Sequence, residues 1–98
     1  MNRRPTHNLD AFRRAMAQNL RWTGVARAGA DALGFAVVDV KSTVASMKPG
    51  MFCKSMPSEK RPGQMQDVYH VPSRVGLLYV KFTDEGIAEF VLLSFKRK

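Results

Sequence analysis

Residues 75–96, VGLLYVKFTDEGIAEFVLLSFK, contain two apolar runs separated by a short polar turn. In the first run, apolar side chains at positions 78, 80 and 82 alternate with Tyr79 and Lys81. Such alternation is typical of a strand that packs one face on a core. The Asp-Glu-Gly turn at 84–86 is a hairpin signal. This stretch therefore predicts two antiparallel strands, at 75–83 and 87–95.

The second run of this hairpin also alternates, with Val91, Leu93 and Phe95 at every second position. We expect these residues to share the covered face of the sheet with the apolar residues of the first strand. A connecting loop of two or four residues keeps the two apolar sets on one face, whereas a three-residue loop would flip one strand. With the first choice, Tyr79 and Lys96 emerge together on the opposite, open face. The hairpin thus predicts a surface on which a tyrosine and a lysine can act together.

The segment 51–69, MFCKSMPSEKRPGQMQDVY, leads into a third strand. We expect a helical turn at 51–56, which a proline ends, then a long loop and a strand at 67–71. Long loops inside compact domains are often functional. Gln66 and His70 are four residues apart, so in a strand their side chains point to the same face. If Gln66 faces the open side, His70 does too. This strand can therefore add two polar side chains to the open face.

The first part of the chain predicts two helices. Residues 9–20 place apolar side chains at helical spacing, and Thr23 can cap a second helix that Gly34 ends. The residues before position 9 are expected to form a loose arm. Residues 35–44, FAVVDVKSTV, are rich in β-branched side chains and predict a first strand. Together these elements predict an α+β fold, a small antiparallel β-sheet with two N-terminal helices packed on one face.

The composition fits one small basic domain that spans residues 1–98. Hydrophobic residues make up 45% of the chain, which is enough for one modest core. Sixteen lysines and arginines outnumber eight acidic residues, so the formal net charge is +8. A charge of this size favours a polyanionic partner, either RNA or DNA, or an acidic protein.

Cysteine and histidine usage excludes several kinds of site. Cys53 is the only cysteine, which excludes an internal disulfide and fits a reducing cytoplasm. We expect it to be a small buried hydrophobe. One cysteine with the distant His7 and His70 does not have the spacing of a zinc site, so no metal and no cofactor are expected. No apolar run is long enough to span a bilayer, and we expect a cytoplasmic protein without a membrane partner.

An open face that carries Gln66, His70, Tyr79 and Lys96, with Lys54 brought in from the preceding turn, has the residue types of a metal-independent ribonuclease. In that reaction the ribose 2′-OH loses a proton as it attacks phosphorus, and the leaving 5′-oxygen gains one. The extra charge of the phosphorane must be stabilised. Lysines supply positive charge, tyrosine or histidine can move protons, and glutamine can hold a phosphate or a base edge.

Four short motifs in this order resemble the MqsR family of mRNA interferase toxins. They are Lys54-Ser55-Met56, Gln66-Asp67-Val68-Tyr69, Leu78-Tyr79-Val80-Lys81 and the terminal Ser94-Phe95-Lys96-Arg97-Lys98. The resemblance implies a RelE-like ribonuclease toxin fold, ribosome-independent cleavage of mRNA with a preference for GCU-like sites, and a cognate antitoxin as partner.

The resemblance also implies roles for individual residues. The family's functional positions fall on Lys54, Gln66, Tyr79 and Lys96, which we expect to be catalytic. Met56 and His70 are expected to contact the substrate. This chain has Cys53 and His70 where the family's best-known member has tyrosine and arginine. A neutral histidine cannot clamp phosphate as arginine does, but it can exchange protons near pH 7. Of these two roles, we expect RNA binding for His70.

Two other functions are compatible with the charge. The chain could be a non-catalytic RNA- or DNA-binding protein, in which exposed aromatic side chains of a sheet stack on bases. It could also be an interaction protein whose basic surface serves only an acidic partner. A long RNA incubated with the protein and EDTA separates the three, because fragments indicate an enzyme, a gel shift indicates a binder, and neither indicates the third.

Overall fold

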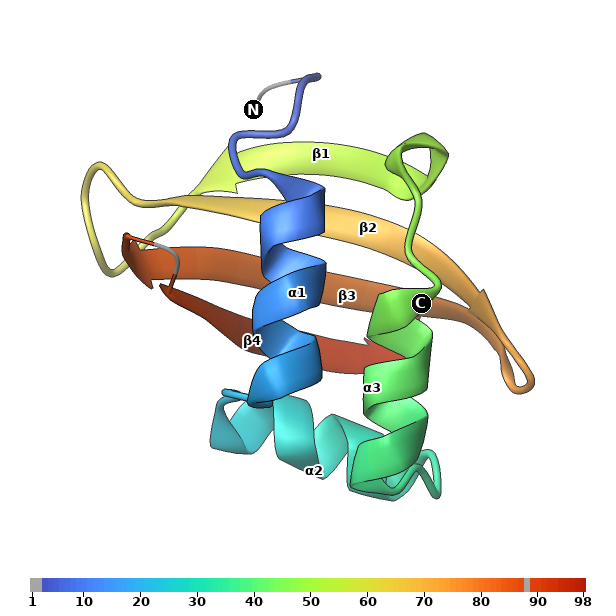
Figure 1. The fold of residues 1–98 in the computed structure, drawn as a ribbon. Coiled ribbons are helices and arrows are strands. Elements are labelled where there is room, and N and C mark those ends of the chain that lie inside the picture. The colour runs from blue at the N-terminus through green and yellow to red at the C-terminus, as the bar shows by residue number, and fades with distance from the viewer. Residues whose placement is uncertain (1–2, 88) are drawn as a thin grey trace.

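The computed structural model describes residues 3–87 and 89–98. Within these residues, three helices and a short 3₁₀ turn are followed by four strands. The helices are α1 (Leu9–Gln18), α2 (Gly24–Ala32) and α3 (Val37–Ala45), the 3₁₀ turn is η1 (Pro49–Met51), and the strands are β1 (Phe52–Pro57), β2 (Met65–Ser73), β3 (Gly76–Gly86) and β4 (Glu89–Arg97). The strands form one antiparallel sheet in the order β1-β2-β3-β4 (Figure 1), which confirms the α+β class.

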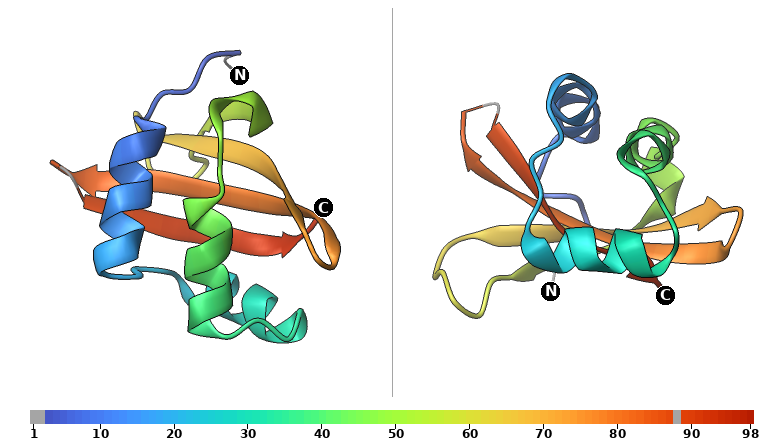
Figure 2. Two further views of the ribbon diagram at one scale, coloured as in Figure 1. Left: turned by 45° about the vertical axis from the view of Figure 1, so that its right-hand side comes forward. Right: turned by 90° about the horizontal axis from the view of Figure 1, so that it is seen from below.

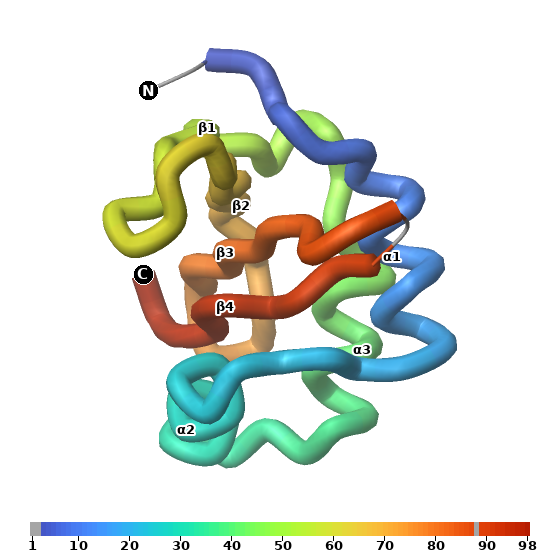
Figure 3. Tube along the Cα trace, turned by 90° about the vertical axis from the view of Figure 1, so that its left-hand side faces the viewer, coloured from blue at the N-terminus to red at the C-terminus, as the bar shows by residue number. Residues whose placement is uncertain are grey.

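Helices α1 and α3 lie across one face of the sheet, whereas α2 lies along the edge of β4 (Figures 1 and 2). In Figure 3 the sheet is seen edge-on, with α1 and α3 on one side and the loop between β1 and β2 on the other. The expected packing of two N-terminal helices on one face is therefore not confirmed, because α2 contacts mainly β4. The segment before α2 explains its place, since Thr23 donates its N–H to Leu92 of β4 at 3.0 Å.

Helix α1 forms where the apolar spacing predicted it and packs on aromatic residues of the sheet. The side chain of Asn8 caps its first turn by accepting the N–H of Ala11 at 2.9 Å. Phe12 is fully buried and stacks on Phe82 with ring centroids 3.7 Å apart. These contacts fix α1 on the covered face of the sheet.

Residues 35–44 were predicted as a strand, and this prediction is wrong because most of them form α3. Val40 and Val44 are four residues apart and both fully buried, so they form one apolar stripe of a helix. Asp39 accepts the N–H of Ala36 at 2.8 Å and so caps the first turn. Burial of the stripe and this cap outweigh the strand preference of the β-branched residues.

The predicted helical turn at 51–56 is also wrong, because β1 occupies residues 52–57. Only η1, which begins at Pro49, is helical in this region. Strand β1 pairs antiparallel with β2, and Ser55 lies opposite Asp67 with both side chains fully buried. Pairing with β2 satisfies the backbone of this segment, which short-range sequence signals do not reveal. The three later strands form where they were predicted, each with slightly different bounds.

A β-bulge in β4 corrects the predicted faces of the last strand. Lys81 pairs with Ser94, but the next residue of β3 pairs with Leu92, so Leu93 is an extra residue. The bulge reverses the alternation. Phe95 lies in the core as expected, while Leu92 and Phe90 take the places expected for Val91 and Leu93. Because the extra residue Leu93 precedes Ser94, the residues of β4 from Ser94 to its C-terminal end keep the predicted faces.

Thr6 and His7 are held against the sheet, so this part of the N-terminal segment does not form the expected loose arm. The carboxylate of Asp67 accepts the N–H groups of Thr6 at 3.1 Å and His7 at 2.8 Å. The hydroxyls of Thr6 and Ser55 are hydrogen-bonded at 2.6 Å. The ring of His7 contacts the carbonyl of Met65 through Nε2 at 2.7 Å. This part of the arm therefore ties α1 to β1 and β2. Residues 1 and 2 lie outside the described residues.

Candidate functional site

The face of the sheet opposite α1 and α3, which we call the open face, carries the residues singled out from the sequence. The core on the covered face takes alternate residues of β2 and β3, such as Tyr69 and Val80. The residues between them point to the other side. The strand register then arranges the open-face side chains in three rows that cross the strands.

The first row consists of His70, Tyr79 and Lys96. His70 lies directly opposite Tyr79, and Tyr79 directly opposite Lys96. The rings of His70 and Tyr79 have centroids 6.3 Å apart, and the ammonium nitrogen of Lys96 lies 5.3 Å from the centre of the Tyr79 ring. The predicted emergence of Tyr79 and Lys96 on one face is thus confirmed, and His70 lies beside them.

The second row contains Lys54 of β1 and Lys81 of β3. Both lie directly opposite Val68 of β2, one from each side. Lys54 belongs to the predicted site and reaches it from a strand rather than from a helical turn. Lys81 was assigned to this face from its parity but not to the site. Lys81 is half-buried and has charged neighbours on other strands, which makes it a candidate residue of the site. These neighbours could not be predicted from the sequence, because they depend on how the strands pair.

Met56 and Gln66 form the third row and line a pocket of about 350 Å³. Residues 57–60 close one side of this pocket, and Lys81 and the bulge residue Leu93 complete its lining. The bulge therefore turns an apolar side chain from the expected core position to the open face. The pocket combines thioether and aliphatic groups with an amide and charged side chains.

The loop between β1 and β2 is tied down over this pocket. Ser58 donates its N–H to the carbonyl of Gln64 at 2.8 Å, and the side-chain amide of Gln64 donates to the carbonyl of Asp84 at 3.4 Å. Arg61 forms an ion pair with Glu85 of β3 at 3.7 Å. These contacts keep the loop close to β3, although the exposed ion pair adds little stability.

Burial and neighbouring charges shift the pKa values of three open-face residues. Burial lowers the pKa of His70, and the ammonium groups of Lys98 and Lys54 lower it further, so the neutral ring predominates at pH 7. Burial raises the pKa of Tyr79, and Cys53 raises it further when its side chain is ionised, so the phenol keeps its proton. The first row therefore contains a neutral imidazole beside a protonated phenol.

Burial lowers the pKa of Lys81, and Lys96 lowers it further. Glu59 acts in the opposite direction, and Lys54 acts in the same direction as Lys96. Charged groups influence one another this way only when they lie close together. The lysines of β1 and β4 therefore lie close enough to Lys81 on the open face to lower its pKa.

Cys53 is exposed, which corrects the expectation that it is buried. The register between β1 and β2 shifts between Phe52 and Lys54, and Cys53 is the residue inside this irregularity. A bulge leaves one residue outside the regular ladder. Its side chain is therefore not part of the core.

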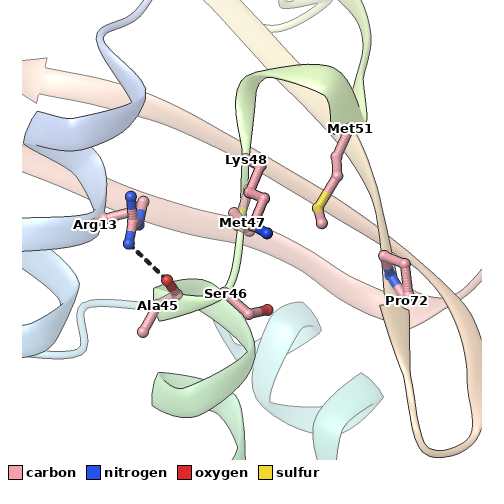
Figure 4. Close-up of a pocket in the computed structure, with 7 residues that line it drawn as sticks. All are labelled: Arg13, Ala45, Ser46, Met47, Lys48, Met51 and Pro72. Carbon is pink, nitrogen blue, oxygen red and sulfur yellow. Dashed lines mark hydrogen bonds between the residues drawn. The ribbon is translucent and has the colours of Figure 1, made fainter.

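A pocket on the covered side of the molecule contains none of the predicted site residues. Arg13, Met47, Lys48, Met51 and Pro72 are among the residues that line its volume of about 390 Å³ (Figure 4). The guanidinium of Arg13 donates to the carbonyl of residue 45, the last residue of α3, at 2.7 Å. A cation at this position satisfies the end of α3 and joins the helix to α1. This pocket is explained by helix packing.

Among the described residues, no helix is long and apolar enough to cross a membrane. The same residues contain no cluster of three or more histidine, cysteine or acidic side chains that could hold a metal ion.

Comparison with known proteins identifies the family. A family profile described as "Motility quorum-sensing regulator, toxin of MqsA" matches residues 4–97, nearly the whole chain. No curated protein matches the chain. The match includes all four strands and all the residues of the three rows. The family is one of toxins that act with an antitoxin, MqsA, as partner. The chain therefore belongs to the MqsR toxin family of toxin–antitoxin systems.

Proposed function

We propose that this toxin is an endoribonuclease that cleaves mRNA without a metal ion and without the ribosome. The observation that carries the proposal is the set of lysines beside His70 and Tyr79 on one open face. A phosphate bound there meets positive charge from several strands and groups that can exchange protons. The family resemblance supports a RelE-like ribonuclease fold and a preference for GCU-like sites.

Lys54 and Lys96 are proposed to stabilise the charge of the phosphorane. They lie on the two outermost strands, so their side chains can approach a phosphate above β2 and β3 from opposite sides. Fixed positive charge at the place where negative charge develops is a large term in enzyme catalysis. The proximity of Lys96 to the Tyr79 ring holds its ammonium group over the open face.

His70 is proposed to accept the proton of the 2′-OH. Its lowered pKa leaves the ring neutral at pH 7, and a neutral imidazole has a free nitrogen acceptor. This state favours proton transfer over the RNA clamp that the sequence led us to expect, because clamping requires a charged ring. Tyr79 keeps its proton and can donate a hydrogen bond to a phosphoryl oxygen.

Gln66 and Met56 are proposed to bind the nucleotide beside the cut. Gln66 lies between the phosphate-binding rows and the pocket under the β1–β2 loop, so its amide can reach a phosphate or a base edge. Met56 and Leu93 offer apolar surface to the face of a base. A pocket of this composition can discriminate between bases, which is a requirement for site preference.

The proposal is tested by incubating a long RNA with the purified protein in EDTA and resolving the products on a gel. Discrete fragments that end in a 2′,3′-cyclic phosphate and a 5′-hydroxyl are expected. A gel shift without fragments would instead support the non-catalytic RNA-binding function. Lys48→Ala is a matched control, because Lys48 is exposed and lines the pocket on the covered side.

A further inference from the structure

Lys81 has the most central position of the open-face lysines. It lies on β3, an inner strand, directly opposite Val68 of β2 and Ser94 of β4. His70 and Lys96 are its diagonal neighbours, since both pair with Tyr79, two residues before Lys81. Diagonal neighbours in an antiparallel sheet are roughly 7–8 Å apart, a span that can hold a phosphate group.

The surroundings of Lys81 distinguish it from the lysines at the rim. Lys81 and Lys54 are both half-buried, whereas Lys96 is exposed. Of these three lysines, it is Lys81 that lines the pocket under the β1–β2 loop. The charged groups around it come from three directions: Lys54 on β1, Glu59 and Lys60 on the loop, and Lys96 on β4. A cation that is partly buried among other cations releases its proton more readily than a solvated lysine.

We propose that Lys81 is the general acid, which donates a proton from its ammonium group to the leaving 5′-oxygen. This inference rests on the proposed ribonuclease function. The 2′-oxygen forms a bond to phosphorus, its proton passes to His70, and the bond from phosphorus to the 5′-oxygen breaks. The 5′-oxygen takes a proton from Lys81, and solvent returns that proton to the resulting amine.

The geometry favours Lys81 over the other lysines for this role. The attacking and leaving oxygens lie roughly in line on opposite sides of phosphorus, so acid and base must flank the phosphate. His70 and Lys81 are diagonal neighbours on adjacent strands and meet this requirement. A general acid also works best when its pKa lies near the working pH, and an ordinary lysine pKa of about 10.4 is too high for that.

The test compares two RNA substrates under single-turnover conditions. One is an ordinary oligonucleotide, and the other has sulfur in place of the bridging 5′-oxygen, a leaving group that departs without protonation. Lys81→Ala is expected to lose about 10²–10⁴-fold in cleavage of the ordinary RNA, the usual contribution of a general acid. The thio substrate should reduce this loss to within about tenfold of the unmodified protein.

Lys81→Arg separates proton transfer from charge. Arginine keeps the positive charge and a long side chain but does not release its proton, so this variant should be as slow as Lys81→Ala on the ordinary RNA and recover on the thio substrate. The rate of the unmodified protein should fall as the pH rises through the lowered Lys81 pKa. Lys48→Ala should behave as the unmodified protein on both substrates.

Several results would overturn the inference. Full activity of either Lys81 variant on ordinary RNA excludes the role, and an equal loss on both substrates means that Lys81 contributes charge only. If the unmodified protein cleaves neither RNA, the proposed ribonuclease function itself is wrong. If the unmodified protein cleaves RNA and the Lys81 variants do so equally well, only the role of Lys81 is wrong. Thermal unfolding of each variant shows whether it is folded, and Lys81→Arg retains the packing if Lys81→Ala does not.

Discussion

Gly29→Ala tests how closely α2 and β4 are joined. A methyl group at Gly29 would fall inside the contact distance of the Phe95 carbonyl oxygen and lie 3.1 Å from its carbonyl carbon. Both atoms belong to the backbone of β4, so no side chain can rotate away. Helix α2 would have to withdraw by roughly 1 Å to restore normal carbon contact distances. The edge of β4 would then lose the cover that α2 provides.

The expected loss follows from two opposing terms. Alanine stabilises a helix interior by about 0.8–1 kcal/mol relative to glycine. Overpacking costs about 1–3 kcal/mol, and the upper end applies here because the obstacle is backbone. We therefore expect Gly29→Ala to lower the free energy of unfolding by roughly 1–2 kcal/mol, which for a chain of this size lowers Tm by roughly 5–15 °C.

The assay is thermal unfolding followed by circular dichroism, with Gly24→Ala as the control in the same helix. A methyl group at Gly24 meets nothing within 4 Å, so this control should unfold within about 0.5 kcal/mol of the unmodified protein. RNA cleavage should fall as well, because the clash is with the backbone of Phe95 and a shift of this backbone would displace the adjacent Lys96. Equal stability of the two variants would refute the close packing inferred between α2 and β4.

The remaining predictions concern the reaction and the partner. Lys54→Ala and Lys96→Ala should each reduce single-turnover cleavage by about 10²–10³-fold at unchanged Tm, and two variants with normal rates would remove these lysines from the mechanism. His70→Arg should lower the single-turnover cleavage rate by about 100-fold or more at every pH between about 5.5 and 8.5. The cleavage rate of the unmodified protein should fall as the pH falls through the lowered His70 pKa, because protonation of the imidazole removes the base. Retained cleavage with tighter RNA binding at alkaline pH would instead assign His70 to binding. Cleavage should continue in EDTA, and a strict requirement for added magnesium would contradict this chemistry. Expression of the toxin alone should arrest growth, and co-expression of its antitoxin should restore it; harmless expression of the intact toxin would count against the proposal.

Local sequence patterns determined the elements whose signals lie within a few residues. Asn8 and Thr23 cap the first two helices, because a short polar side chain reaches the free N–H groups of its own first turn. The alternation in β3 fixed which of its side chains are buried, since the side-chain period of a strand is two. Tyr79 and Lys96 could be brought to one face on this basis, because Val80 and Phe95, the residues next to them, lie in the core as the alternation predicted.

Only the tertiary structure decided the features that depend on partners far along the chain. Residues 35–44 became a helix because Val40 and Val44 find a common core, and β1 became a strand because β2 pairs with it. One extra residue in β4 moved Leu93 from the core face to the pocket. Lys81 acquired its neighbours through the pairing of four strands and a loop that closes over them. The burial and the charge around such a residue come from segments that are far apart in the sequence. A local pattern therefore reveals which side chains of one strand share a face, but not which side chains of other strands they contact.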